Sequence, residues 1–556
     1  MPKRLAVTIA GAVSLGSYEA GVLYEVLDAI HHHNNDPATS DSDRIVIDVF
    51  TGASAGAQTV IILAQKLMYS AGEFRGPYDN PLYHAWVERI SLEGLQQTED
   101  DEPALHSVFS SDLIEAISRE ALLSRYASTL PPKERHAAVG GIIRVGVALT
   151  NLNGIAYGYP VEPGGEFVYI DYGDQLTDEV IDATSDNPEF WERLRQAAVA
   201  SGAFPIAFRP QDLSRSAKHQ PDDYPAENLV PWTQDPQPYT YSDGGILQNQ
   251  PLGMAKNLVD LNDFHRDQDS RYYLFVSPHE KDPNTNDTLH AGNADYFHLI
   301  VRLVSVAIGQ SGFQDWITAK GVNAQLALLD SRAKGLRDAI IDHKIDVPCL
   351  ATTSTSVLHL FFPTGDHLAP GSRVRETLDE AKARIASQYH DWFADLTAIP
   401  DASDAFRDAV LAFETSAGLG ARDCMTIYGI TAKDTELASS GLEAFLGFFD
   451  QSFRDHDYDV GRSHARKVLQ DPALGAPDAL GPIRYTGSAI RPIDSRLDGL
   501  KLRNVPEADL KAFKSGMRKR LNEMLRELWG PVWSLAAVPG SDLILDSILD
   551  RMIAKM

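Results

Sequence analysis

The stretch Ile45–Met68, "IVIDVFTGASAGAQTVIILAQKLM", places a buried strand, a turn of small residues and an apolar helix in direct succession. Its centre, "GASAG" at residues 52–56, has the pattern G-x-S-x-G. Between a strand and a helix, this pattern is typical of a nucleophile elbow, a sharp turn that lifts a serine hydroxyl out of the sheet. The positive end of the helix would favour negative charge beside that serine. The stretch predicts Ser54 as a nucleophile, and the alternative is a tight turn with an idle serine.

Strand-like and helix-like segments alternate through the first half of the chain. The strand candidates are "LAVTIA" (5–10), "IVIDVF" (45–50), "IIRVGVALTNL" (142–152), "TYSDGG" (240–245) and "YYLFVS" (272–277). Helix-like runs follow the first two of them, and the first of these runs has apolar residues at i, i+3, i+4 and i+7, namely Leu23, Val26, Leu27 and Ile30. This order predicts an α/β domain with a largely parallel sheet, in which ligand chemistry gathers at the carboxyl ends of the strands.

Helical patterns dominate the later part of the chain. They cover Glu376–Leu396, Leu442–Phe453 and Glu507–Trp529. We therefore predict an α/β domain over residues 1–335 and a mainly α-helical region over 336–556. The run "SVLHLFFP" is the one good strand candidate there, and residues 355–362 are expected to return a strand to the core. The basic helix at the end is expected to be a packed helix with a solvated face rather than a membrane-surface helix.

A nucleophilic serine needs a base, and "YSDGGILQNQP" offers Asp243 at the end of a strand. The alternative interpretation is an ordinary Asp-Gly turn. The usual hydrolase order would place a histidine downstream. The candidates are His265, His279, His290 and His298. Spacing alone leaves a Ser-Asp-His triad and a Ser-Asp dyad both open.

The loop "AGAVSLGSYEAG", residues 10–21, follows the first strand and leads into a helix. Gly11 and Gly16 have P-loop spacing, but the phosphate-binding lysine is absent. A dinucleotide fingerprint needs glycine where Val13 stands. Serine attack on an ester creates an oxyanion that requires N–H donors. The loop therefore predicts an oxyanion hole built from the backbone of Gly11, Ala12, Val13 and Ser14.

Taken together, the small-residue loop, the G-x-S-x-G elbow and the later Asp-Gly-Gly resemble the patatin-like phospholipase family. The segment "AAVASGAFPIAFRP" (197–210) and the Asn249 and Pro251 after Asp-Gly-Gly are similar to that family as well. "AVSLGSYEAGV" and "FFDQSFRDHDYDVGR" resemble the bacterial patatin-related subset with a long C-terminal extension. The resemblance spans about Arg4 to Pro278.

This resemblance implies a three-layer α/β/α sandwich that hydrolyses acyl esters of lipids with a Ser-Asp dyad. Ser54 matches the nucleophile and Asp243 the base, and no cofactor or metal is implied. The glycines that support the three motifs are Gly16, Gly52, Gly56, Gly244 and Gly245.

The oxyanion loop of the family reads G-G-G-x-[K/R]-G, and the chain departs from it at three positions. Ala12 and Val13 replace glycines, and Leu15 replaces the basic residue. Backbone N–H groups survive such replacements, and Ala or Val is acceptable where φ is negative. The departure motivates a second hypothesis, a weakly active or inactive effector or scaffold whose C-terminal region binds a partner.

The net charge of −27 argues against nucleic acid as a partner and against adsorption of the whole surface to anionic lipid. A lipid or phospholipid ester is the expected substrate, with peripheral contact to membranes. Cys349 and Cys424 are expected to be reduced thiols of a cytoplasmic protein. The N-terminal apolar run is expected to be a strand rather than a signal peptide. No stretch of about 18 apolar residues occurs.

Three further segments are open to a metal-binding interpretation. His31–His33 are expected at a helix C-terminus, where the dipole favours them. Ser452–Arg462 is expected to be a salt-bridged corner between a helix and a loop. Residues 282–288 partly resemble an EF-hand calcium loop but lack its Gly and Glu, so a solvated loop is expected.

Overall fold

The computed structural model of the chain describes most of its 556 residues. The described residues are 2–97, 106–161, 164–177, 179–216, 229–263, 271–280, 296–362, 366–368, 375–417, 419, 425–440, 445–476, 479–501, 505 and 507–529. The chain divides into two compact units. Unit 1 comprises Met1–Leu252, Tyr273–Gly312 and Ile427–Met556, and unit 2 comprises Gly253–Tyr272 and Phe313–Thr426.

Unit 1 is built on a sheet to which nine strands of the described residues belong, in the order β11-β8-β1-β2-β3-β7-β6, with β4 and β5 paired to β3. The strands are β1 (Lys3–Ile9), β2 (Ile45–Gly52), β3 (Val139–Val161), β4 (Gly165–Leu176), β5 (Val180–Ile181), β6 (Gln211–Arg215), β7 (Gln237–Ser242), β8 (Arg271–Glu280) and β11 (Ile427–Lys433). The pairs β1–β2, β2–β3 and β8–β11 are parallel, and β4, β5 and β7 run antiparallel to β3. Each predicted strand of the first half is present, and the apolar runs of β1 and β2 are buried on both faces of the sheet.

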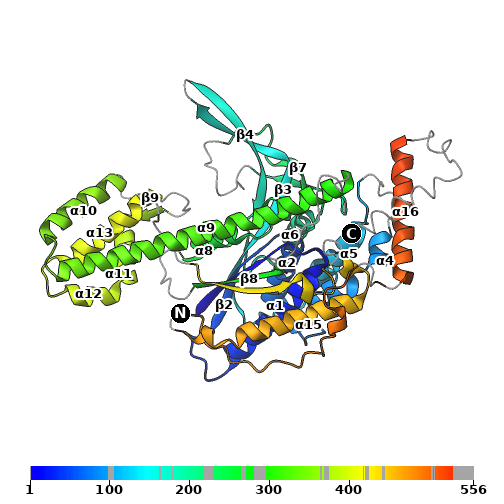
Figure 1. Cartoon of the computed structure of the whole chain (residues 1–556), viewed down its shortest axis with the longest axis horizontal. Coiled ribbons are helices and arrows are strands. Elements are labelled where there is room, and N and C mark those ends of the chain that lie inside the picture. The colour runs from blue at the N-terminus through cyan, green and yellow to red at the C-terminus, as the bar shows by residue number, and fades with distance from the viewer. Residues whose placement is uncertain are drawn as a thin grey trace. The chain divides into compact units, whose positions relative to one another are not determined.

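Helices flank this sheet, so the predicted α/β/α architecture is confirmed (Figure 1). The helices of the described chain are α1 (Gly16–Asn35), α2 (Ala55–Tyr69), α3 (Pro81–Tyr83), α4 (Leu92–Gln96), α5 (Asp112–Leu123), α6 (Pro188–Ser201), α7 (Gly245–Gln248), α8 (Leu252–Asp263), α9 (Tyr296–Ile341), α10 (Val347–Phe361), α11 (Leu378–Gln388), α12 (His390–Leu396), α13 (Ala402–Ser416), α15 (Gln451–Leu469) and α16 (Glu507–Trp529). Both α1 and α2 follow their strands as the periodicity predicts. The histidines at 31–33 end α1, as expected.

The compact units divide the chain differently from the predicted boundary after residue 335, because residues 427–556 belong to unit 1. The predicted strand at 355–362 is wrong, since these residues continue α10. Asp346 caps that helix by accepting from the N–H of Cys349, and Pro348 lies in its first turn. These start signals outweigh the β-propensity of the apolar run. The strand that does join the sheet from the later part of the chain is β11.

Two further expectations for the C-terminal region also need correction. The helix predicted over Leu442–Phe453 begins only at Gln451, where Asp450 caps it by accepting from the N–H of Ser452. Ser452–Arg462 is then the interior of α15 and not a corner between helix and loop. Most of its charged residues are buried, because α15 packs on α1 and on β11.

Close packing of α15 on α1 buries charged side chains of α15. It also requires glycine where the two helices touch. A Cβ on Gly461 would overlap the carbonyl oxygen of Tyr18. The buried guanidinium of Arg462 donates to the buried carboxylate of Glu25 at 3.0 Å. Buried charges are tolerated where they are paired in this way. Helix α15 is therefore an integral part of unit 1.

Gly461→Ala is expected to lower the free energy of unfolding by about 1–3 kcal/mol, since the added methyl group forces α1 and α15 apart. Gly475→Ala is the matched control, because a Cβ there meets nothing within 4 Å. Urea denaturation of the two variants measures the difference. Equal stability of both variants would contradict the close helix contact.

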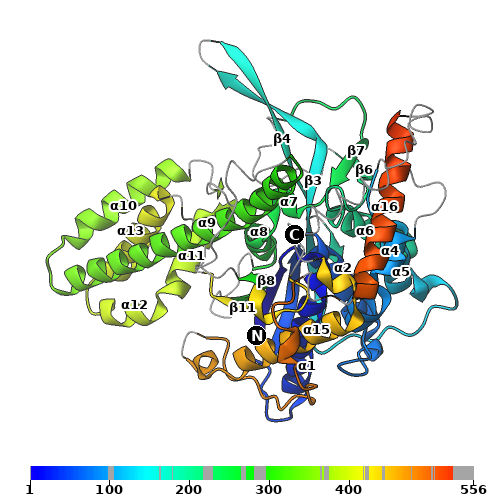
Figure 2. The ribbon, with the colours of Figure 1, turned by 45° about the vertical axis from the view of Figure 1, so that its right-hand side comes forward.

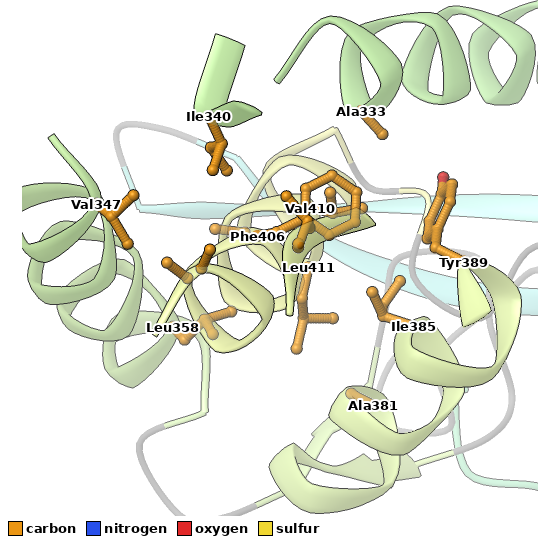
Figure 3. Packing of buried hydrophobic residues seen from close by; sticks show 14 of the residues in the cluster. Ala333, Ile340, Val347, Leu358, Ala381, Ile385, Tyr389, Phe406, Val410 and Leu411 are labelled. Carbon is orange, nitrogen blue, oxygen red and sulfur yellow. The ribbon is translucent and has the colours of Figure 1, made fainter. Parts of the chain in front are cut away.

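Unit 2 has a hydrophobic core of its own, formed by helices. Figure 3 shows Phe406, Val410 and Leu411 of α13 at its centre, with Ile385 of α11 and Leu358 of α10 beside them. The remaining core residues that Figure 3 labels are Ala333, Ile340, Val347, Ala381 and Tyr389. A short antiparallel pair, β9 (Asp366–Leu368) with β10 (Arg375–Thr377), belongs to the same unit.

The remaining expectations have mixed outcomes. The basic helix α16 matches its predicted bounds and packs through Phe513 against Phe449, with ring centroids 5.0 Å apart. Arg520 on it is buried, so that part of the basic face is not solvated. Cys349 is an exposed free thiol, whereas Cys424 and residues 282–288 lie outside the described residues. Among the described helices, none combines the length and the apolar character needed to cross a membrane.

Candidate active site

Ser54 occupies the sharp turn between β2 and α2 that the sequence predicts. Its backbone has φ +52° and ψ −124°, a conformation that a residue with a side chain adopts only under strain. The flanking glycines make the turn possible. A Cβ on Gly52 would lie 2.5 Å from the backbone of Gly56, and a Cβ on Gly56 would lie 2.5 Å from the carbonyl oxygen of Ile9. The side chain of Ser54 is thereby presented at the end of the sheet, with 7% of the residue exposed.

Asp243 ends β7 and lies directly beside this serine. The Oγ of Ser54 donates to Oδ2 of Asp243 at 2.6 Å, within the range that a nucleophile and its base require. The hydroxyl of Thr150 and the carbonyl of Ala203 hold the backbone of Asp243, at 2.8 and 3.0 Å. Two residues that are 189 positions apart in sequence therefore meet at one edge of the sheet.

The two glycines after Asp243 have separate structural roles. A Cβ on Gly244 would overlap the carbonyl oxygen of Ala148, so only glycine allows β7 to lie this close to β3. The N–H of Gly245 donates to Oδ1 of Asp243 at 2.7 Å. The carboxylate is therefore held on both oxygens, with one oxygen on the backbone and the other on Ser54.

Burial dominates the electrostatics of Asp243, which is 1% exposed. Desolvation raises the pKa of its carboxyl to about 7, although the hydrogen bonds from Ser54 and Gly245 oppose the rise. A carboxyl with a pKa near neutrality accepts a proton more readily than an ordinary aspartate does. The environment thus suits Asp243 to work as a general base.

Two polar residues complete the site, although the sequence assigns them no role. The Oγ of Ser201, at the end of α6, accepts from the N–H of Ser54 at 2.9 Å and donates to the carbonyl of Ala148 at 2.7 Å. The backbone carbonyl oxygen of Asn249 accepts from the N–H of Gly11 at 3.1 Å. The small-residue run that ends α6 and the polar run after Asp-Gly-Gly are the only sequence signals for them.

The predicted oxyanion loop passes directly beside Ser54. A Cβ on Gly11 would lie 3.0 Å from the Cβ of Ser54, so glycine is needed for this approach. The N–H of Gly11 is already bonded to Asn249, which removes it from the predicted set of donors. In the part of the chain that the structure describes, the N–H groups of Ala12 and Val13 have no acceptor. Of the predicted set, Gly11 is thus excluded, whereas Ala12 and Val13 stay candidate donors to an oxyanion, and no described contact of the Ser14 N–H decides its part.

The first turn of α2 adds one more donor at the elbow. The N–H of Ala55 follows Ser54 directly and bonds to none of the described residues. Unpaired N–H groups are usual in the first turn of a helix, and they favour a negative charge. Ala55 therefore joins Ala12 and Val13 as a candidate donor.

Comparison with known proteins finds a family for part of the chain. Residues 7–256 match the family model described as patatin-like phospholipase. This part of the chain is a patatin-like phospholipase domain. The chain is also similar to the uncharacterized protein y4iI of Sinorhizobium fredii (strain NBRC 101917 / NGR234), at 24% identity over 354 residues. The match covers 50% of this chain, and the chain spans about half the length of that curated relative, 49%.

The departures of the patatin-like domain from the family loop now have a structural context. Ala12 has φ −141°, which any residue adopts. Val13 has φ +50°, in the region that favours glycine, so the condition of a negative φ, under which valine is acceptable, is not met at this position. Leu15 is completely buried, and a basic side chain in its place would have to lie in the core. Because Val13 stands where the family pattern has glycine, the predicted oxyanion loop contains backbone strain.

Val13→Gly is expected to raise the free energy of unfolding by about 1 kcal/mol, because it removes strain that is typically worth 1–3 kcal/mol. Ala12→Gly is the matched control and is expected to lower it by about 1–2 kcal/mol, since the buried methyl group of Ala12 is lost and the unfolded chain gains entropy. Thermal denaturation measures both variants. A loss of stability in Val13→Gly as large as that in Ala12→Gly would contradict the strain.

A segment outside the family match supports this loop. The hydroxyl of Ser14 accepts from the N–H of Gly447 at 3.2 Å. A Cβ on Gly447 would lie 2.6 Å from Ser14 Oγ and 2.6 Å from Ser439 Oγ. Arg454 of α15 donates to the carbonyl of Gly447 at 2.6 Å, and Asp457 accepts from the N–H of Ser439 at 3.1 Å. The C-terminal part of unit 1 therefore supports the loop of residues 11–14 through Gly447.

The histidines proposed for a triad do not meet the dyad in the described structure. Among the described residues, Ser54 and Asp243 form no hydrogen bond with a histidine. His279 is the one candidate whose side chain is described, and it lies in β8. His265 and His290 lie outside the described residues, and the side chain of His298 is not described.

Proposed function

We propose that the patatin-like domain is a serine acyl hydrolase of lipid esters, of phospholipase A, lysophospholipase or lipid esterase type. The observation that carries this proposal is the 2.6 Å hydrogen bond from Ser54 Oγ to a buried Asp243 at a strained elbow. The family description names phospholipids as the substrate class. Strain at a serine is maintained where the surrounding structure enforces it, and such residues cluster at active sites.

The first half of the reaction forms an acyl-enzyme. The Oγ of Ser54 bonds to the carbonyl carbon of the ester while Asp243 takes its proton. The carbonyl oxygen becomes negative, and the N–H groups of Ala12, Val13 and Ala55 are the donors that stabilise it. The carbon–oxygen bond to the alcohol then breaks, and the leaving oxygen receives the proton from Asp243. The products are a free alcohol and an acyl group esterified to Ser54.

The second half of the reaction releases the acid. Asp243, again a carboxylate, takes a proton from water as the water oxygen bonds to the acyl carbon. The same N–H donors stabilise the second oxyanion. The bond to Ser54 Oγ breaks, and the serine oxygen recovers its proton from Asp243. One carboxyl therefore serves both as base and as acid, and no metal or cofactor enters the cycle.

A fluorophosphonate probe tests the proposal, because it forms a covalent bond only with an activated serine. We expect labelling of Ser54, located by mass spectrometry of the digested protein, together with hydrolysis of a soluble p-nitrophenyl ester. Prior reaction with the probe should abolish hydrolysis. A protein that leaves the probe unreacted, with lipid and with detergent present, would support the effector or scaffold hypothesis.

The pH dependence of hydrolysis follows from the pKa of Asp243. The base must be ionised to take the proton of Ser54, so activity requires a pH above its pKa of about 7. We expect kcat/KM to fall about tenfold per pH unit below that value and to level off above it. Initial rates with a soluble ester measure the profile. A profile that stays flat down to about pH 5 would indicate an aspartate of ordinary pKa.

A further inference from the structure

The hairpin formed by β3 and β4 extends beyond the active site. In β3, Val147 pairs with Gly52, and Thr150 bonds to Asp243, so these residues are level with the dyad. The strand continues to Val161 and returns as β4. Its regularly paired outer part, from Ile155 onward, is about 20 Å long at roughly 3.3 Å per residue. Figures 1 and 2 show this hairpin extending away from the helices that cover the sheet of unit 1.

Apolar side chains are exposed on both faces of this outer hairpin, chiefly on β4, whereas Ile155 and Tyr157 of β3 are buried. The exposed ones are between 44% and 57% exposed and comprise Val161, Phe167, Val168, Tyr169, Ile170 and Tyr172. Successive residues of a strand point to opposite faces, so Phe167 and Val168 lie on different sides. A hairpin normally buries one face against a core. A contiguous apolar surface of this kind marks an interaction site.

The charge of the hairpin narrows the choice of partner. No lysine or arginine occurs between Arg144 and Arg193, whereas Glu162, Glu166 and Asp171 lie in the hairpin sequence. An anionic lipid surface attracts basic clusters, so this hairpin gains no electrostatic attraction to such a surface. Tyrosine and phenylalanine next to aliphatic residues are the composition that enters the interface of a neutral bilayer.

We propose that the β3–β4 hairpin docks unit 1 onto an electrically neutral lipid surface. The inference rests on the proposed function, because a lipid hydrolase must reach esters that are packed in such a surface. The hairpin begins at the edge of the sheet where Ser54 and Asp243 lie. Its apolar outer part enters the interface and keeps the active-site edge of the sheet near the lipid.

The test uses the full chain and vesicles of phosphatidylcholine. The hairpin variant combines Phe167→Thr, Val168→Thr and Ile170→Thr, since threonine keeps β-propensity while removing apolar surface. The matched control combines Leu303→Gln, Leu328→Gln and Leu360→Gln, three apolar residues of α9 and α10 that are 55–79% exposed. Flotation of each protein with the vesicles measures binding.

We expect the hairpin variant to bind at least about tenfold more weakly than the parent, and the control to bind like the parent. Adding phosphatidylglycerol to the vesicles or raising the salt concentration should not strengthen the binding of the parent. The Ser54→Ala protein should float like the parent, so that docking is measured separately from hydrolysis. Circular dichroism and hydrolysis of a soluble ester should be the same for the hairpin variant and the parent, which shows that the fold is intact.

Two results would overturn the proposal. One is unchanged flotation of a folded hairpin variant. The other is a parent that does not float with these vesicles but forms a dimer that the hairpin variant converts to a monomer, since the surface would then bind a second copy of the chain. If the parent hydrolyses no ester at all but still floats through its hairpin, the proposed function fails while the docking surface stands.

Discussion

Ser54→Ala is expected to lower kcat/KM for a soluble ester by about 10⁴-fold or more, because no other group can form the acyl-enzyme. The elbow holds this hydroxyl 2.6 Å from its base and beside the loop donors. Alanine keeps the backbone of the turn but removes the attacking atom. Residual turnover would come from the oxyanion donors and from substrate binding alone.

A matched control for this variant is Ser118→Ala. Ser118 is as buried as Ser54, at 7% exposed, but it lies in α5 and accepts from Arg195. Hydrolysis of a p-nitrophenyl ester and labelling by a fluorophosphonate probe measure both proteins. We expect Ser118→Ala to keep both activities. Parental rates in the Ser54→Ala protein would show that the nucleophile is elsewhere.

Asp243→Asn is the second change with a large expected effect. We expect kcat to fall by about 10²–10⁴-fold, the usual contribution of a general base. The variant should also lose the acid limb of the pH profile, because the titrating group is gone. Asp48→Asn is the matched control, a buried carboxylate of β2 that pairs with Arg4 at 3.5 Å. Its activity and its pH profile should stay close to those of the parent.

Asp243→Asn should also change the pH dependence of stability. Burial raises the pKa of Asp243 in the folded protein above its unfolded value, so its favourable contribution is present at acid pH and is lost as the pH rises through about 7. The variant should therefore gain stability relative to the parent as the pH is raised from about 4 to about 8. Thermal denaturation at the two pH values measures this difference. A stability difference that does not depend on pH would contradict the raised pKa.

Residues beyond the family match support the loop beside Ser54. The family match ends at residue 256, yet Gly447 bonds to Ser14 and Arg454 bonds to Gly447. The loop beside Ser54 is therefore held by contacts from outside the matched domain. Asp457, which is completely buried, fixes the neighbouring backbone by accepting from Ala438 and Ser439.

Much of the fold and the core of the site could be predicted from local sequence. Strand and helix periodicity are local properties, and the turn at residues 52–56 requires small residues wherever it occurs. Asp243 was predictable because Asp-Gly-Gly at the end of a strand combines a carboxylate with a sharp turn. From the sequence, Val13 and Leu15 could be recognised only as departures from the family loop. The strain at Val13 and the burial of Leu15 became known only from the structure.

Tertiary packing decided the rest, since contacts between distant segments leave little local signal. The run at 355–362 has strand-like composition, but Asp346 and the packing of unit 2 make it helical. Burial of the charged α15 depends on Glu25, which lies more than 400 residues earlier. The sequence alone determined five strands of the first half, the elbow and the identity of the dyad candidates. Only the folded chain decided that Gly11 donates to Asn249, that Val13 is strained, and that burial brings the pKa of Asp243 near neutrality, because each depends on neighbours that folding brings together.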